Sequence, residues 1–419
     1  MKKVIADSNQ IEKYIHKLGS IGLINGQLWR PAYTPAYREA KNLVSSWMSD
    51  MGLVVKEDAV GNLFGVANPP LKGRFSKKVV MTGSHLDTVR NGGKYDGAAG
   101  IICSLFAVSA LQKQFGAPLL PVEVVALCEE EGSRFPKAGF LGSRAIVGGL
   151  LEDELLYRDE QGITLHHAMI NDGLDPNKLD FAKRDDIGVF LELHIEQGPI
   201  LEHANIDLGI VEKITGLMLL EIEVVGRADH AGITPMDLRL DALVGVANFL
   251  KKLPSLALNI SKYARATVGI ISLKPAMTNV VPEKVKIFID LREVDEGRLL
   301  KLEQVVKERL FKLDNEGYQV KVDRVFYDKP TSMDAGLARM AEETARGRNI
   351  SYLRMNSGAG HDAQVFGRLI PALMLFVPCR GGRSHCPEEY SLPQDLALAT
   401  EVLTDLLYEL AWSLNLRNN

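Results

Sequence analysis

An apolar run that ends in a histidine and a carboxylate constrains the fold of this chain more than any other segment. Residues 79–81 read Val-Val-Met, and the chain continues through His85 and Asp87 to a glycine-rich turn at 92–97. Such runs are typical of buried strands in parallel sheets, and α/β sheets build their sites at the carboxyl ends of strands. Imidazole nitrogen and carboxylate oxygen together suit zinc and similar ions. The segment therefore predicts an α/β fold with a metal site; the alternative is a surface turn with a structural histidine.

Three later segments repeat this pattern of an apolar run followed by potential ligands. The strand predicted at 122–128 runs into Glu129-Glu130-Glu131, the one at 189–195 carries His194 before Gln197, and the one at 372–378 leads to His385. Adjacent carboxylates repel one another unless a cation lies among them. We therefore expect one shared site at four strand ends, the alternative being four independent surface loops.

The number of candidate ligands exceeds what one tetrahedral zinc ion binds. A carboxylate can bridge two ions with its two oxygens, and metals roughly 3.5–4 Å apart are a known hydrolytic arrangement. Asp96 stands alone in its glycine-rich turn and is the expected bridge. Where two acids are adjacent, one can bind metal while its neighbour acts as general base toward water.

Eight motifs occur in a fixed order along the chain: GSHLDTV, GGKYDG, EEEGSRF, LHIEQG, GRADHAG, TNVVPE, SGAGHDA and SHCPEE. As a set they resemble the dinuclear-zinc aminoacylase and carboxypeptidase superfamily. Within it, the chain is similar to the branch of N-carbamoyl-L-amino acid hydrolases and allantoate amidohydrolases. The resemblance extends from residue 61 to the final helix.

The resemblance implies two divalent metal ions per chain, zinc first, with manganese, cobalt and nickel as alternatives. It implies one ion on His85, Asp96 and His194 and the other on Asp96, Glu131 and His385. It also implies Glu130 as the general base and Asp87 as the acid that orients His85.

Further residues are implicated in binding substrate. The resemblance implies that Asn279 and Arg292 hold a substrate carboxylate, for which a guanidinium fork is well suited. It implies that His230 is a catalytic histidine that reaches the site of a partner subunit and polarises the scissile carbonyl, which requires a homodimer. Gln197 is a candidate substrate contact, and the glycine-rich turn with Gly358 and Ala359 offers backbone groups to substrate.

Two regions of different pattern indicate two domains. In residues 1–212 and 330–419, apolar strands alternate with helical stretches such as 98–115, which predicts a mostly parallel central sheet covered by helices. In residues 213–329 the expected order is strand 217–225, helix 241–253, strands 267–273 and 285–291, helix 297–312 and strand 319–325. This order predicts an inserted ferredoxin-like α+β domain. We expect the first region to be the metal-binding catalytic domain and the second to serve as lid and dimerisation domain.

Composition agrees with a soluble cytoplasmic enzyme. The net charge of −4 over 419 residues favours neither nucleic acid nor membrane as a partner. Asp7 interrupts the amino terminus before a signal-peptide apolar region develops, and no apolar run approaches the ~20 residues that span a bilayer. The four cysteines include no C-x-x-C pair, so a disulfide framework is not expected. Cys386 is a candidate ligand or nucleophile, but the metal set is complete without it.

The function implied by the resemblance is hydrolysis of a terminal ureido (carbamoyl) C–N bond in a small carboxylate-bearing molecule. The segments EEGSRFP, SGAGHDAQVF and PCRGGRSH favour allantoate, whereas FLGSRAIVG and HIEQGPILE also suit N-carbamoyl-L-amino acids. An inward-pointing Arg383 would favour a more anionic substrate. A metallo-dipeptidase or aminoacylase is a further alternative. A non-catalytic binding protein would be expected to lose a ligand or the base, and this chain has lost none. The roles of Arg383, Cys386 and His361 stay open.

Overall fold

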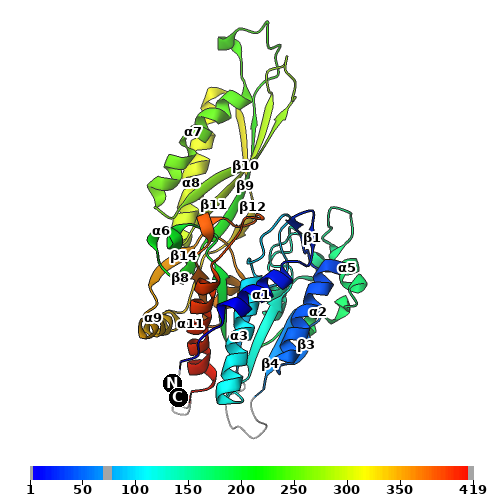
Figure 1. Ribbon diagram of the computed structural model, residues 1–419. Helices are drawn as coiled ribbons and strands as arrows, with labels where there is room; N and C mark the ends of the chain where they lie inside the picture. Colours follow the sequence, from blue (N-terminus) through cyan, green and yellow to red (C-terminus); the bar gives the residue numbers. More distant parts are fainter. Residues whose placement is uncertain (1–2, 69–77, 414–419) are drawn as a thin grey trace. The chain divides into compact units, whose positions relative to one another are not determined.

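The computed structural model describes residues 3–68 and 78–413 and divides the chain into two compact units (Figure 1). The first unit consists of Met1–Glu212, Ser332–Met355 and His361–Asn419, and the second of Lys213–Thr331 and Asn356–Gly360. Residues 356–360 thus belong to the second unit, although the sequence pattern assigns them to the first. Their contacts explain the difference, because Thr215 donates its backbone N–H to the Ser357 carbonyl (3.0 Å).

The first unit is built on a nine-stranded mixed sheet. Four adjacent strands, in the order β15-β7-β5-β6, run parallel to one another, which confirms the predicted parallel α/β architecture. Antiparallel strands flank them on both sides. In sheet order the strands are β13 (Thr331–Ser332), β8 (Leu208–Ile214), β15 (Ala372–Val377), β7 (Ile187–Ile195), β5 (Val79–His85), β6 (Val122–Leu127), β4 (Leu63–Ala67) and β3 (Val54–Glu57), with β14 (Tyr352–Ser357) paired to β8.

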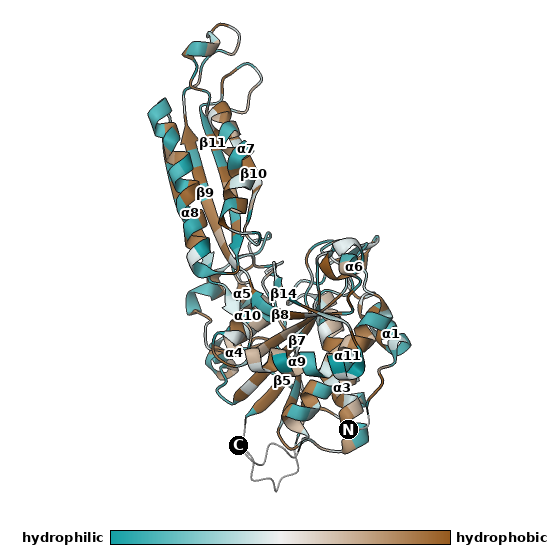
Figure 2. Cartoon of the chain, turned by 90° about the vertical axis from the view of Figure 1, so that its left-hand side faces the viewer, coloured by the Kyte–Doolittle hydropathy of each residue, from teal (hydrophilic) through white to brown (hydrophobic). Residues whose placement is uncertain are grey.

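Every residue of β5, β6 and β15 is buried, as expected for parallel strands that are covered on both faces. Figure 2 shows the ribbon of β7 as largely apolar. Among the helices, α3 and α11 pack on the sheet and on each other, and α1 packs on both (Figure 1). The helices of this unit are α1 (Ser8–Leu18), α2 (Pro35–Asp50), α3 (Ala98–Phe115), α4 (Leu141–Ile146), α5 (Leu165–Asn171), α6 (Ile200–Ala204), α9 (Ala335–Arg348), α10 (Asp362–Gly367) and α11 (Pro393–Ala411).

Helix α3 is mostly apolar, with its charged residue, Lys113, in the last turn. Among the described residues, it is the one helix that is long and apolar enough to cross a membrane. Of its 18 residues, 67% are buried inside the structure. Because α3 contacts β5, β6 and β7, it has the surroundings of a core helix.

The second unit contains the predicted strand and helix order. Strands β9 (Gly216–Val225), β10 (Arg265–Lys274), β11 (Lys284–Glu293) and β12 (Gln319–Asp328) form an antiparallel sheet in the order β10-β11-β9-β12, together with α7 (Ala242–Ile260) and α8 (Glu296–Leu310). Residues along β9 and β11 alternate between buried and half-buried, so one sheet face packs on the core. Helix α7 continues to Ile260 although Pro254 predicts an end at 253; buried Ala257 anchors the extra turns.

Candidate metal centre

The parallel strands deliver their polar residues to one edge of the first unit. His85 is the last residue of β5, and His194 is the second-last of β7. Glu130 and Glu131 follow β6, and His385 follows β15. Asp96 lies just before α3. Because the four strands are parallel, their carboxyl ends meet at the same edge of the sheet.

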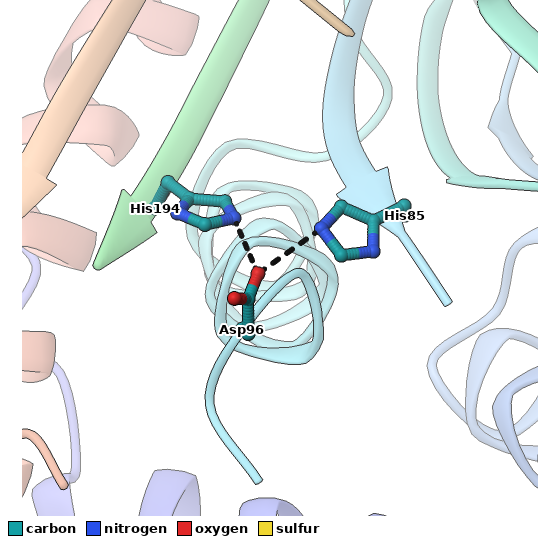
Figure 3. A group of neighbouring side chains, drawn as sticks. All are labelled: His85, Asp96 and His194. Carbon is teal, nitrogen blue, oxygen red and sulfur yellow. Dashed lines mark ion pairs between the residues drawn. The ribbon is translucent and has the colours of Figure 1, made fainter. Parts of the chain in front are cut away.

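Two histidines face one oxygen of Asp96. The Asp96 Oδ1 atom lies 3.2 Å from His85 Nε2 and 3.1 Å from His194 Nε2 (Figure 3). The His85 Nδ1 atom lies 3.1 Å from the Asp87 carbonyl, and His194 Nδ1 lies 2.9 Å from the Ile195 carbonyl. These contacts fix both rings with Nε2 toward the carboxylate, which is the arrangement found in metal-binding histidines.

The other oxygen of Asp96 belongs to a second group. Its Oδ2 atom lies 3.2 Å from His385 Nε2, which lies 3.4 Å from Glu131 Oε1. Gln197 donates from Nε2 to the same Oδ2 (2.8 Å). In each three-residue group the candidate ligand atoms lie within 4.8 Å of one another. Asp96 therefore presents one oxygen to each group.

The donor set fits divalent cations. Asp96 Oδ1 is buried, and among the described residues it receives no hydrogen bond despite two imidazole nitrogens nearby. Imidazole nitrogen and carboxylate oxygen, with no thiolate, suit zinc, manganese, cobalt and nickel. A cation between these atoms would satisfy a buried oxygen that the protein leaves unsatisfied.

Burial of several carboxylates together also indicates a cation. Burial raises the pKa of Glu130 well above its usual range and the pKa of Glu131 to about 7. A hydrogen bond to Asp96 raises the pKa of His385 to about 9. Without a cation, these groups therefore keep protons near neutral pH. A divalent ion competes with those protons, so its affinity depends on pH.

Asp87 contacts the segment after β6 as well as His85. Its carboxylate accepts the backbone N–H groups of Glu130 (3.0 Å) and Glu131 (3.1 Å), while its Oδ1 lies 3.8 Å from His85 Nδ1. The backbone carbonyl of Asp87 is the closer partner of His85. Asp87 thus holds the segment of Glu130 and Glu131 in place, and it orients His85 through its main chain.

The chain around the site adopts uncommon backbone conformations. Glu129, Gln197 and His385 have positive φ values of 53°, 57° and 56°, which are costly for residues with a Cβ and cluster at functional sites. Gly97 also has a positive φ, and a Cβ there would lie 2.4 Å from the His85 carbonyl oxygen. Glycine in the YDG motif therefore lets Asp96 approach His85.

Two buried residues support this segment: Arg30, which sequence analysis missed, and Glu129, to which it gave no role beyond the acidic triplet. The Arg30 guanidinium donates to the carbonyl of Leu86 (2.9 Å), the residue after His85. It also donates to the carbonyls of Leu18 (3.1 Å) and Ile21 (3.2 Å). Glu129 accepts backbone N–H groups from Ala32, Arg134 and Phe135, and so acts as a structural member of the acidic triplet. A solitary arginine in WRP carries no pattern that would identify it.

The residues predicted to bind the carboxylate and the scissile carbonyl of a substrate belong to the second unit. His230 and Asn279 come together there, because the loop after β9 pairs with residues 279–281 through an isolated bridge. The His230 Nδ1 atom accepts two backbone N–H groups, at 3.0 and 3.2 Å, so the exposed Nε2 carries the proton. Arg292 pairs with Asp290 through two contacts of 2.9 Å and donates to the Gly358 carbonyl (2.7 Å).

The structure shows the contacts of Ala359 and of Arg383, Cys386 and His361, whose roles the sequence left open. Ala359 donates its backbone N–H to the Ser357 hydroxyl (3.1 Å). Arg383 is exposed and pairs with Glu388 (3.0 Å), so it does not point inward. Cys386 is half-buried and has a free thiol. His361 is buried with its ring 4.6 Å from that of His194, which indicates packing support for that ring.

Comparisons with known proteins identify the family of the chain. A model of peptidase family M20/M25/M40 matches residues 81–409. An allantoate amidohydrolase of Bacillus subtilis (strain 168) is 39% identical over 98% of this chain and 100% of its own length. An N-carbamoyl-L-amino-acid amidohydrolase of Paenarthrobacter aurescens is 36% identical over 95% of this chain and 97% of its own.

A solved structure also resembles the chain along its length. It is an amidase of the hydantoinase/carbamoylase family from Burkholderia multivorans, with a TM-score of 0.88, 28% identity and coverage of 97% of this chain and 98% of its own. These matches confirm the resemblance indicated by the ordered motifs. The chain belongs to peptidase family M20/M25/M40.

Proposed function

We propose that this protein hydrolyses a terminal ureido C–N bond in a small carboxylate-bearing substrate, with allantoate as the first candidate. The observation that carries the proposal is full-length similarity to an allantoate amidohydrolase, together with an intact set of ligands and an intact base. N-carbamoyl-L-amino acids are the second candidate, because relatives of that activity are nearly as similar. Since Arg383 points outward, it gives no support to a more anionic substrate.

We propose that two divalent ions bind at the two groups that share Asp96. His85 and His194 would hold one ion, Glu131 and His385 would hold the other, and Asp96 would bridge them. Zinc is the first candidate. Such ions, when bound, activate water and polarise a carbonyl group.

Glu130 would act as the general base. It is 8% exposed, and its Oε2 lies 3.8 Å from His85 Nε2, beside the ligand groups. In the proposed reaction it takes a proton from the water that attacks the ureido carbonyl carbon. It then returns this proton to the nitrogen that leaves as the C–N bond breaks. The carbamic acid left by this step then breaks its remaining C–N bond, with its proton moving to that nitrogen, so the final products would be an amine, ammonia and carbon dioxide.

Residues of the second unit would bind the rest of the substrate. Arg292 and Asn279 are proposed to bind the carboxylate, with the turn at Gly358 and Ala359 contributing backbone groups. His230 would donate a hydrogen bond from its Nε2–H to the developing oxyanion. Gln197, hydrogen-bonded to Asp96, would contact the ureido group. We propose that His230 serves a partner subunit, so the active form would be a homodimer. The cytoplasmic location of the protein stays a prediction.

One assay tests the substrate. Ammonia release should be measured from allantoate, N-carbamoyl-methionine and N-carbamoyl-β-alanine, with N-acetyl-methionine tested for hydrolysis in parallel, each with added zinc, manganese or cobalt. We expect the highest kcat/KM with allantoate. Preference for N-carbamoyl-methionine would assign the second function. Hydrolysis of N-acetyl-methionine alone would replace both with an aminoacylase activity.

A further inference from the structure

Two neighbouring glutamates in the segment after His385 have opposite surroundings. Glu389 is buried, with 4% of its surface exposed. Glu388 keeps 58% of its side chain exposed and pairs with Arg383 at the surface. A buried carboxylate needs hydrogen-bond donors to offset its desolvation, so its contacts show what holds it in place.

The Glu389 carboxylate joins two segments that carry candidate metal ligands. Its Oε1 atom accepts the backbone N–H groups of Tyr95 (2.9 Å) and Asp96 (3.0 Å). Its Oε2 atom accepts the hydroxyl of Ser384 (2.6 Å), the residue before His385. The same hydroxyl lies 3.0 Å from Asp96 Oδ2. Glu389 thus links the backbone of Asp96 to the segment of His385.

Gly93 makes room for this carboxylate. A Cβ at Gly93 would lie 2.0 Å from Glu389 Oε1 and 2.1 Å from its Cδ. Any larger residue there would displace Glu389 from the two N–H groups. The GGKYDG and SHCPEE motifs are therefore complementary in space as well as ordered in sequence.

We propose that Glu389 is a positioning residue that fixes Asp96 relative to His385, so that the second group of ligands is preformed before an ion binds. Groups behind metal ligands set the orientation of those ligands and typically change metal affinity or activity 10–100-fold when removed. The inference rests on the proposed metal centre. It assigns to Glu389 no contact with substrate or water.

Metal affinity tests the proposal without substrate. Full-length protein is stripped of metal, and zinc is titrated in competition with a chromophoric chelator. We expect Glu389→Ala to weaken binding of the more weakly held ion on the order of 10–100-fold. Glu388→Ala is the matched control from the same segment and should bind zinc like the wild type.

Three further variants keep the test informative if Glu389→Ala folds poorly. Gly93→Ala attacks the same contact from the other segment and should weaken zinc binding similarly. Ser384→Ala removes only the linking hydroxyl and should give a smaller loss. Glu389→Gln keeps an oxygen for the two N–H groups and should rescue most of the affinity. With saturating zinc, the kcat of Glu389→Ala should recover further than the kcat of Glu130→Gln does. The KM of Glu389→Ala should stay near the wild-type value.

The outcomes separate this inference from the proposed function. If folded Glu389→Ala and Gly93→Ala bind zinc as tightly as Glu388→Ala, Glu389 does not position the ligands and the inference is wrong. A wild type that binds zinc but releases no ammonia from ureido substrates overturns the proposed function alone. Weakened zinc binding in these variants would support the inference even then.

Discussion

The two units use their sheets in different ways. In the first unit, β5, β6 and β15 are buried at every position, and the candidate metal ligands lie at or beyond the strand ends or just before α3. In the second unit, β9 and β11 alternate between buried and half-buried residues, and polar side chains such as Arg292 lie along the sheet or in exposed loops. A sheet covered on both faces can present accessible charges mainly where its strands end, whereas a sheet with one open face can present them along its length.

This difference predicts different consequences of substitution. Among the ligand residues of the first unit, His85, Asp96 and His194 are buried, Glu131 is half-buried and His385 is exposed, and they contact one another. The polar residues of the second unit are more exposed and contact mainly the backbone or one local carboxylate. Changes to the candidate metal ligands of the first unit should therefore alter metal content and turnover together, whereas changes in the second unit should leave metal content unchanged.

The largest effect is expected for Asp96→Ala. Because both oxygens of Asp96 face ligand groups, its removal should lower metal content and reduce turnover by at least on the order of 10⁴-fold, the upper end of what one acid–base group supplies. Metal analysis and kcat measure the two effects. Two ions per chain in the folded variant would contradict the bridging role.

Glu130→Gln should separate chemistry from metal binding. We expect two ions per chain, with turnover reduced on the order of 10²–10⁴-fold, because the variant cannot take a proton from water. Metal analysis and kcat are measured beside exposed Glu388→Gln, which should match the wild type. Near-normal turnover with both ions bound would remove Glu130 from the mechanism.

In the second unit, Arg292→Lys should affect only carboxylate substrates. A point charge does not replace a guanidinium fork, and a hydrogen bond to a charged group contributes about 1.5–3 kcal/mol, so kcat/KM should fall roughly 10- to 100-fold with metal content unchanged. The loss should be much smaller toward an amide analogue without the negative charge. Arg324→Lys, which alters an arginine paired with Glu303 in the same unit, is the control. Equal losses toward both substrates would make Arg292 structural.

The smallest change should come from mixed dimers of two inactive variants. If His230 of one subunit serves the metals of the other, co-expressed His230→Ala and Glu130→Gln chains should recover about a quarter of wild-type turnover per chain, because about half of the dimers are mixed and each has one intact site. Two affinity tags isolate the mixed dimer. A mixed dimer no more active than its parents would mean that the second unit does not act on a partner.

The parallel strands and the residues at their ends could be predicted because they leave local patterns. Apolar runs before His85, Glu130, His194 and His385 predict strands that end together at one sheet edge, and the structure brings these residues to one place. The order βαββαβ of the second unit follows from strand alternation and helical periodicity, which extend over ten or more residues.

What could not be predicted depends on contacts between distant segments. Arg30 lies 56 residues before its hydrogen-bond partner Leu86, and Glu389 lies 293 residues after Asp96. Neither residue has a local period that distinguishes it, and the SHCPEE motif does not separate Glu389 from Glu388. The extension of α7 beyond Pro254 is a similar case, since burial of Ala257 against the core outweighs the local preference to end the helix.

The pairing of β4 with β6 has a consequence for the boundaries of a folding unit. The family match begins at Met81, inside β5, yet β3 and β4 cover the far edge of β6, and Arg30 ties the amino-terminal segment to the residues after His85. A chain cut at residue 81 would expose an apolar strand edge, which favours aggregation, and would lose the buried guanidinium. The stretch that the family model matches is thus shorter than the stretch that must fold together.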